Sequence, residues 1–264
     1  RALEYAIRKM LSSELMEVRL VGEEIKQVAT QELPTLVKYA EPIGFLPEAA
    51  SYARGLAAEL TDSCEKPFQL IDIDPDGEDK ILAAVLYHFS NVSFQNCLTE
   101  VKGFSQAEKQ ALVNKLFEKV GKFDNPLREL EYAGATFDLI MDQGAYFEFK
   151  RHRMMTQTVQ DFNIDHGYAI PLAITEAGLD DKFRQSMDEA AGLYTQIASW
   201  NPQVAAYVLP NAFNRRVLCQ VNLRSLFHFI KLRSAANAHF SIRRVAIGML
   251  ELIEPHYPLF TGKI

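Results

Sequence analysis

Two clusters of basic and hydrogen-bonding residues could bind an anionic ligand. The first is the run Lys150-Arg151-His152-Arg153, and the second is the segment 222–233, NLRSLFHFIKLR. Guanidinium groups hold phosphate or carboxylate through paired hydrogen bonds, and a histidine adds a further donor. Taken alone, the first run also suits a solvated helix end, where cations lie near the negative pole of the helix dipole.

The distribution of charge separates a compact anionic ligand from a nucleic acid. The 264 residues include 28 basic and 34 acidic side chains, yet the stretch 190–250 contains no Asp or Glu. Its cations are Arg215, Arg216, Arg224, Lys231, Arg233, Arg243 and Arg244. Nucleic-acid binding would require a more basic domain with aromatic stacking positions, so we expect a small anion. The alternative is that these cations pair with acidic groups elsewhere in the fold.

If the segment 222–233 is helical, its side chains form three stripes. An apolar stripe contains Leu223, Leu226, Phe227 and Ile230, a second contains Asn222, Ser225, Phe229 and Arg233, and a third contains Arg224, His228 and Lys231. A surface helix normally mixes glutamate with its cations. Cations without acids therefore indicate a ligand or another subunit, although Asn222 also suits the N-cap of the helix.

Together the two clusters resemble the flavin-dependent thymidylate synthase family. That family carries an R-H-R motif and a later N-x-R-S-L-x-H-F-x-x-L-R segment, matched here by Arg151-His152-Arg153 and by 222–233. The turn Val208-Leu209-Pro210 and the stretch ANAHFSIRRVA that follows add to the match. The resemblance covers roughly residues 110–264.

The resemblance implies both a fold and a reaction. The fold is α+β, with a mixed or antiparallel sheet and long packed helices, in subunits that share their active sites. The reaction is the reductive methylation of dUMP to dTMP, with methylenetetrahydrofolate, NADPH and FAD. Arg151, His152, Arg153, Asn222, Arg224 and His228 would bind FAD, and Arg151 and Arg233 would bind dUMP. Arg233 would polarise the uracil ring, so the mechanism needs neither a protein nucleophile nor a metal.

Four positions depart from the family pattern. Val159, Asp161 and Asn163 replace the glutamate, serine and arginine that follow the R-H-R motif, and Tyr207 replaces a phosphate-binding arginine. An aspartate beside a dUMP phosphate would repel it. Upstream, the stretch NPLRELEYAGATF also lacks the histidines of the family. The alternative function is therefore a catalytically degenerate domain that structurally supports an active sister domain.

A third hypothesis is a metal-dependent site. Asp161, Asp165 and His166 form a D-x-x-x-D-H pattern that His152 could complete. The pattern is weak, because a solvated loop has the same composition.

The elements that must position these residues are mostly helices. We predict strands at 67–74 and 135–142. We predict helices at 1–40 (two, the second ended by Pro34), 41–62, 78–93, 105–121 with a Ser105–Glu108 capping box, after Asp142, and at 180–199, 202–208 and 222–253. The strands do not alternate regularly with helices, which favours an α+β fold.

The opening of the chain repeats its end. RALEYAIRK matches RSLFHFIKL at 224–232, and after a one-residue slip Arg19 falls over Arg243 and Pro34 over Pro258. We therefore expect residues 1–40 to be the helical tail of a preceding similar domain and residues 41–264 to be the thymidylate synthase-like domain. The two repeats should then have the same helical arrangement, within a longer parent polypeptide.

The remaining features indicate a cytoplasmic protein. No window contains about eighteen uninterrupted apolar residues, so we expect no membrane span. Cys64, Cys97 and Cys219 are scattered without a CxxC pair, which suits free thiols in a reducing compartment. We expect a homo-oligomer, or a pseudo-tetramer made of two tandem chains.

Overall fold

The structure is a computed structural model, and it describes residues 2–61, 66–121 and 124–263. The chain divides into two compact units, residues 1–65 and 66–264. The division lies after the helix predicted at 41–62.

The described residues of the first unit form helices joined by short loops. Its helices are α1 (Ala2–Leu11), α2 (Met16–Glu32), α3 (Pro34–Val37) and α4 (Phe45–Ala57). Pro34 opens α3, because proline lacks only an N–H that has no helical partner in the first turn. A small core joins α1, α2 and α3, and its buried side chains are Ile7, Leu11, Ala29, Val37 and Ala40.

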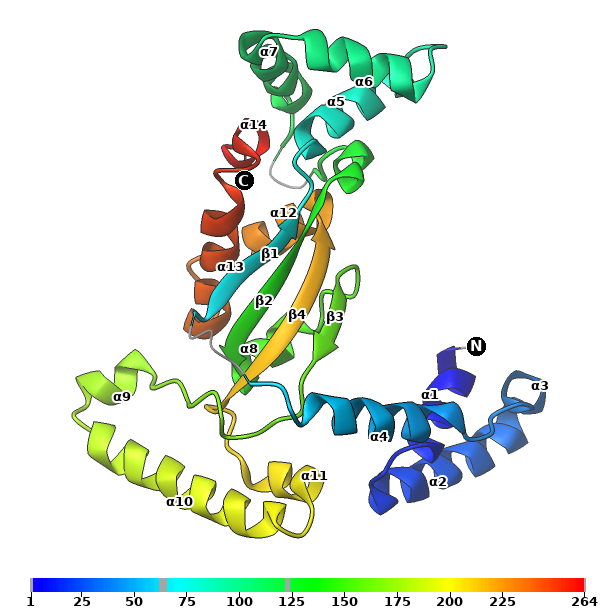
Figure 1. Ribbon diagram of the computed structural model, residues 1–264, viewed down its shortest axis with the longest axis vertical. Coiled ribbons are helices and arrows are strands. Elements are labelled where there is room, and N and C mark those ends of the chain that lie inside the picture. Colours follow the sequence, from blue (N-terminus) through cyan, green and yellow to red (C-terminus); the bar gives the residue numbers. More distant parts are fainter. Residues whose placement is uncertain (1, 62–65, 122–123, 264) are drawn as a thin grey trace. The chain divides into compact units, whose positions relative to one another are not determined.

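A four-stranded antiparallel sheet forms the centre of the second unit (Figure 1). The strands are β1 (Phe68–Ile73), β2 (Gly134–Asp142), β3 (Thr156–Val159) and β4 (Asn214–Asn222), in the order β1-β2-β4-β3. β1 and β2 confirm the two predicted strands. β3 and β4 were not predicted, because β3 has only four residues and β4 begins with an asparagine and two arginines.

Helices cover one face of this sheet. Alternate residues of β2 and β4 are buried on that face: Phe137, Leu139, Met141, Val217, Cys219 and Val221. The covering helices include α8 (Gln143–Phe149), α12 (Leu223–Arg233) and α13 (Phe240–Ile253). The predicted apolar stripe of 222–233 is confirmed, since Leu223, Leu226, Phe227 and Ile230 are all buried.

The prediction of one continuous helix at 222–253 was wrong. α12 is capped at Ser234, and α13 begins after His239, whose ring nitrogen accepts from the Ser241 N–H at 3.4 Å. The intervening SAANAH stretch contains serine and asparagine, whose side chains compete with helical hydrogen bonds. The break lets two separate helices pack on the same sheet.

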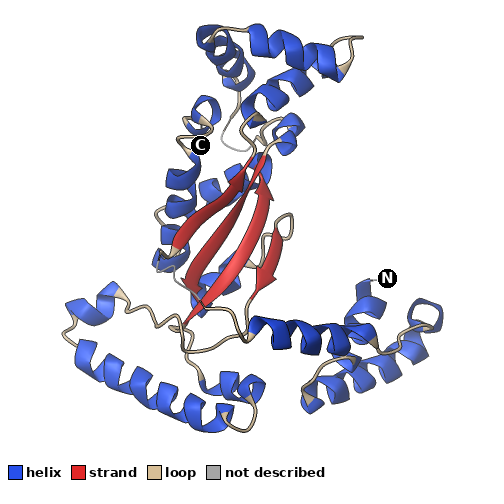
Figure 2. Ribbon diagram, in the orientation of Figure 1, coloured by secondary structure: helices blue, strands red, loops and turns tan. Residues whose placement is uncertain are grey.

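The other helices form two groups (Figure 2). α5 (Gly77–His88), α6 (Phe94–Gly103), α7 (Gln106–Phe117), the 3-10 helix η1 (Arg128–Tyr132) and α14 (Pro258–Thr261) extend the main core. α9 (Leu172–Glu176), α10 (Asp180–Ala198), α11 (Pro202–Ala205) and the 3-10 helix η2 (Ala206–Val208) belong to the region of a smaller core around Met187, Leu209 and Phe213. The predicted capping box is confirmed: Ser105 Oγ accepts from the Glu108 N–H, and Glu108 Oε2 accepts from the Ser105 N–H.

The fold is α+β, as predicted. Cys97 and Cys219 are buried free thiols, while Cys64 lies outside the described residues. Across the described part of the chain, every helix is too short or too polar to cross a lipid bilayer.

Candidate functional site

A cavity of about 850 Å³ lies beside α12 and brings the two predicted clusters together. Five of the seven predicted site residues line it: Arg151, His152, Arg153, Arg224 and His228. The other lining residues are Phe117, Val120, Asp124, Asn125, Pro126, Met154, Met155, Ser225, Phe227, Lys231, Leu232 and Lys263. The volume lies within the roughly 300–1,000 Å³ typical of small-molecule sites, and the lining combines cations with apolar side chains.

The Arg151-His152-Arg153 run lies in a turn between α8 and β3. The His152 N–H donates to Phe149 O at 3.0 Å, and the Gln157 amide donates to Phe149 O and His152 O. The His152 ring meets the Phe229 ring edge-to-face, with centroids 4.9 Å apart. Backbone and ring contacts therefore fix the turn against α12.

Arg233 lies against this turn but is not among the residues that line the cavity. Its Nη1 is 2.5 Å from Glu148 Oε2, and its Nε donates to His152 Nε2 at 3.1 Å. Glu148 Oε1 also lies 3.4 Å from Arg151 Nη2. The Arg233 side chain is only 16% exposed, and Glu148 and His152 engage two of the five N–H groups of its guanidinium.

Glu148 was missing from the sequence-based site. Glu148 precedes Arg151 by three residues, a spacing that brings two side chains together on a helix. This spacing was the signal in the sequence that could have indicated the Glu148–Arg151 contact. The contact of Glu148 with Arg233 had no such signal, because the two residues are far apart in the chain.

His152 is a neutral group at pH 7. Its pKa is lowered from 6.5 to about 4, mainly by burial and in addition by the charges of Arg233 and His228, while the charge of Glu148 opposes the shift. Since Nε2 accepts from Arg233, the hydrogen-bond network assigns the ring proton to Nδ1. His152 therefore orients Arg233 and adds no positive charge to the cavity.

Asn222 and Arg224 have structural partners. Asn222 Oδ1 accepts from the Ser225 N–H at 2.8 Å, so Asn222 is the N-cap of α12, and it does not line the cavity. Arg224 lines the cavity, while its Nε donates to Pro126 O and its Nη1 pairs with Glu131 Oε1, both at 3.0 Å.

Ion pairing explains part of the acid-free cationic stretch. Arg216 holds Asp138 through both carboxylate oxygens, Arg224 pairs with Glu131, and Arg233 pairs with Glu148. All three acidic partners lie outside 190–250. The alternative interpretation of the charge pattern is therefore confirmed for these three arginines.

The residues that depart from the family pattern lie outside the cavity lining. Val159 pairs with Val217 in the sheet and packs on the core. Asn163 Oδ1 accepts from the Asp165 N–H at 3.0 Å in a local turn, and Tyr207 is 63% exposed.

The half-buried Arg215 lies near Asp161. Its guanidinium carbon is 4.6 Å from the Tyr146 ring centroid, and its Nη2 donates to Gln160 O at 2.9 Å. Burial lowers the pKa of Arg215, and the charge of Asp161 opposes the shift. Asp161 thus contributes negative charge beside a cation of β4.

The metal hypothesis has no support in the described part of the chain. Three or more His, Cys, Asp or Glu side chains gather nowhere in it at metal-binding distance. His166 Nε2 instead lies 3.4 Å from Gln160 Oε1.

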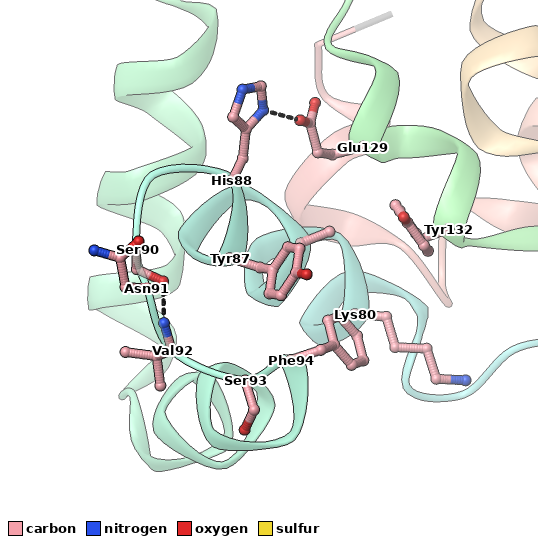
Figure 3. Close-up of a pocket in the computed structure, with 11 residues that line it drawn as sticks. Lys80, Tyr87, His88, Ser90, Asn91, Val92, Ser93, Phe94, Glu129 and Tyr132 are labelled. Carbon is pink, nitrogen blue, oxygen red and sulfur yellow. Dashed lines mark hydrogen bonds and ion pairs between the residues drawn. The ribbon is translucent and has the colours of Figure 1, made fainter.

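A second, more open cavity of about 1140 Å³ lies between α5, α6 and η1 (Figure 3). The His88 ring and the Glu129 carboxylate approach each other at its edge, 2.7 Å apart. Its lysine, Lys80, pairs with Asp74 at 2.6 Å. None of the predicted site residues lines this cavity, so the cavity beside α12 is the candidate site.

The family model described as thymidylate synthase complementing protein, Thy1, matches residues 69–259. The chain belongs to the Thy1 family. The match contains every predicted site residue and the whole of the central sheet except Phe68.

Curated relatives agree with the Thy1 assignment. The chain is 29% identical to a UPF0159 protein of Chlamydia muridarum, over 96% of this chain and 50% of that protein. It is 30% identical to a UPF0159 protein of Chlamydia pneumoniae, over 96% of this chain and 51% of that protein. It is also 30% identical to the flavin-dependent thymidylate synthase of Pyrococcus furiosus, over 46% of this chain and 55% of that enzyme. The chain thus spans about half the length of the curated relatives it matches.

Proposed function

We propose that this chain is a Thy1 domain that binds a flavin dinucleotide in the cavity beside α12 but has lost productive binding of dUMP. In a complete enzyme of this type, dUMP is methylated to dTMP with carbon from methylenetetrahydrofolate and electrons from NADPH. The proposed role of the present domain is to support an active sister domain in an oligomer or pseudo-tetramer.

The observation that carries the proposal is the engagement of Arg233. A guanidinium that polarises a uracil ring must offer free N–H groups to it. Here Nη1 is committed to Glu148 and Nε to His152, in a side chain that is 16% exposed. Binding uracil through Nη1 or Nε would require breaking one of these shielded contacts, and the arginines missing at Asn163 and Tyr207 leave little phosphate-binding energy to offset that cost.

The cavity residues suit an anionic ligand with a flat ring system, such as a flavin dinucleotide. Arg151 is 66% exposed, and Arg153, His228, Lys231 and Lys263 line the same cavity. Phe117, Phe227 and Met155 supply apolar surface for a flat ring system. When bound, FAD would supply electron transfer, while the residues of this chain would hold its phosphates and rings.

Titration of the purified chain with FAD and with dUMP tests the proposal. We expect FAD to bind, with a visible flavin spectrum, and dUMP to show no binding at micromolar concentrations. Arg153→Ala should weaken FAD binding about tenfold or more, because a charge-assisted contact contributes about 1.5–3 kcal/mol. Arg184→Ala on α10 is the matched control and should leave FAD affinity unchanged.

An active thymidylate synthase is the second candidate function. It is favoured by the presence of the full Arg151-His152-Arg153 motif beside the 222–233 segment at one cavity. Micromolar dUMP affinity together with dTMP formation by the chain alone would establish this candidate and overturn the first.

A further inference from the structure

The helical repeat at the two ends of the chain is also a structural repeat. With a shift of 224 residues, Met16 at the start of α2 falls over Phe240 at the start of α13, and α3 falls over α14. The residues before these short helices share their backbone conformation: φ −138° and ψ 51° at Leu33, φ −125° and ψ 53° at Tyr257. The sequence prediction for the repeat is thus matched in helix order and in the starts of α2 and α3, while α2 runs three residues further than α13.

Part of the burial pattern is common to both repeats. The matched pairs that are buried in both are Ile7 with Ile230, Gly22 with Ala246, Ala29 with Ile253 and Val37 with Thr261. In the first unit these positions bring α1, α2 and α3 together.

A second set of matched positions differs sharply. Leu226, Val245, Met249, Tyr257 and Phe260 are 0–2% exposed. Their counterparts Leu3, Val21, Ile25, Leu33 and Leu36 are 37–53% exposed. These five residues define the open face of the first unit. They are apolar, yet they lie outside the core that the described residues of the first unit form.

The second unit shows what covers such a face. There α13 lies on β1 and β2, with Gly248 so close to Phe68 that a β-carbon would meet the ring at 2.5 Å. The Tyr257 hydroxyl donates to Asp74 O and Gly134 O, at the ends of β1 and β2, both at 3.1 Å. The cover is therefore the edge and centre of an antiparallel sheet.

We propose that the open face of the first unit docks on the antiparallel sheet of a further Thy1-type domain in the same polypeptide. Among the described residues of the second unit, the apolar face of the sheet is already covered by α12 and α13, so that face is occupied by its own helices. The chain matches only 50–51% of its UPF0159 relatives' lengths, which leaves room there for a second domain of this size. This inference does not depend on the activity proposed above.

Hydrogen exchange tests the inference, comparing residues 1–264 alone with the complete polypeptide encoded by the gene. We expect the amides of α2 to exchange about tenfold or more slowly in the complete polypeptide, because docking suppresses local opening. Val21→Glu should abolish that protection. Leu20→Glu is the matched control: Leu20 is 53% exposed, but its counterpart Arg244 is exposed too, so protection should persist.

Two results would overturn the inference. Equal exchange of α2 in the short chain and the complete polypeptide would show that no sheet covers the open face. A dimer of residues 1–264 that Val21→Glu dissociates and Leu20→Glu leaves intact would assign the face to a second copy of the chain. Circular dichroism of both variants checks that their helices still form.

Discussion

Glu148 holds Arg233, with 2.5 Å between Oε2 and Nη1, across a gap of more than eighty residues in sequence. The pair joins the end of α8 to the end of α12, and His152 completes it as a neutral acceptor. The side chain that the family resemblance identifies as catalytic is therefore part of a structural contact between two helices.

Glu148→Gln should destabilise the fold modestly. The pair is shielded, at 28% and 16% side-chain exposure, and its loss should cost about 1–3 kcal/mol, towards the lower end because the amide still accepts a hydrogen bond. Urea unfolding measures the change. Glu118→Gln is the control, since the Lys115–Glu118 pair is largely exposed and should contribute within about 0.5 kcal/mol. Equal effects of the two variants would contradict a shielded Arg233 pair.

The same variant should strengthen anion binding in the cavity. Removing the Glu148 carboxylate deletes a negative charge and releases Arg151, 3.4 Å away. We expect FAD affinity to rise roughly threefold to tenfold at low ionic strength, and the gain to shrink as salt screens the charges. A fluorescence titration at two salt concentrations measures it. An unchanged affinity would show that Glu148 does not influence the ligand.

His152 should titrate near pH 4 and not near 6.5. Its pKa is lowered on folding, so the neutral ring contributes stability that is fully present above about pH 6.5 and is lost as the pH falls towards 4. NMR of the imidazole nitrogens measures the titration directly. His152→Gln, whose Oε1 can replace Nε2 as the acceptor for Arg233, should flatten the stability loss between these pH values, whereas His256→Gln should not. A His152 pKa near 6.5 would contradict the buried, Arg233-bound geometry.

Glu78 should make the fold less stable as the pH rises. Its pKa is raised from 4.5 to about 7, mainly by burial; the Leu259 N–H, which donates to Oε1 at 2.7 Å, opposes the rise, and the charge of Asp79 adds to it. The neutral Glu78 carboxyl therefore contributes stability to the fold that is fully present below about pH 4.5 and is lost as the pH rises through 7. Glu78→Gln keeps the acceptor and cannot ionise. Urea midpoints should therefore rise for Glu78→Gln above pH 7 and match wild type near pH 4.5, with Glu254→Gln as the exposed control.

Gly248→Ala should lower stability by about 1–2 kcal/mol. A β-carbon there would lie 2.5 Å from the Phe68 ring, and overpacking outweighs the better helix propensity of alanine. Gly192→Ala on α10 meets nothing within 4 Å and should instead stabilise by about 0.5–1 kcal/mol. Thermal unfolding compares the two. A stabilising Gly248→Ala would contradict the close approach of α13 to β1.

Local patterns in the sequence were sufficient for much of this protein. Hydrophobic periodicity placed β1, β2 and most helices, and the Ser105–Glu108 capping box followed from spacing alone. The third stripe of the 222–233 helix, with Arg224, His228 and Lys231, lines the cavity as its spacing predicts. These features depend on residues within a few turns of one another, so the order of residues determines them.

Tertiary structure alone decided which cations remain available to a ligand. Three arginines, Arg216, Arg224 and Arg233, give part of their hydrogen-bonding capacity to acidic residues more than seventy positions away in the chain, namely Asp138, Glu131 and Glu148. It also decided that β4 is a strand, because the whole of β4, with Arg215 and Arg216 included, pairs with β2. Such long-range partners have no periodic signature in the chain, since only folding brings their side chains within hydrogen-bonding distance.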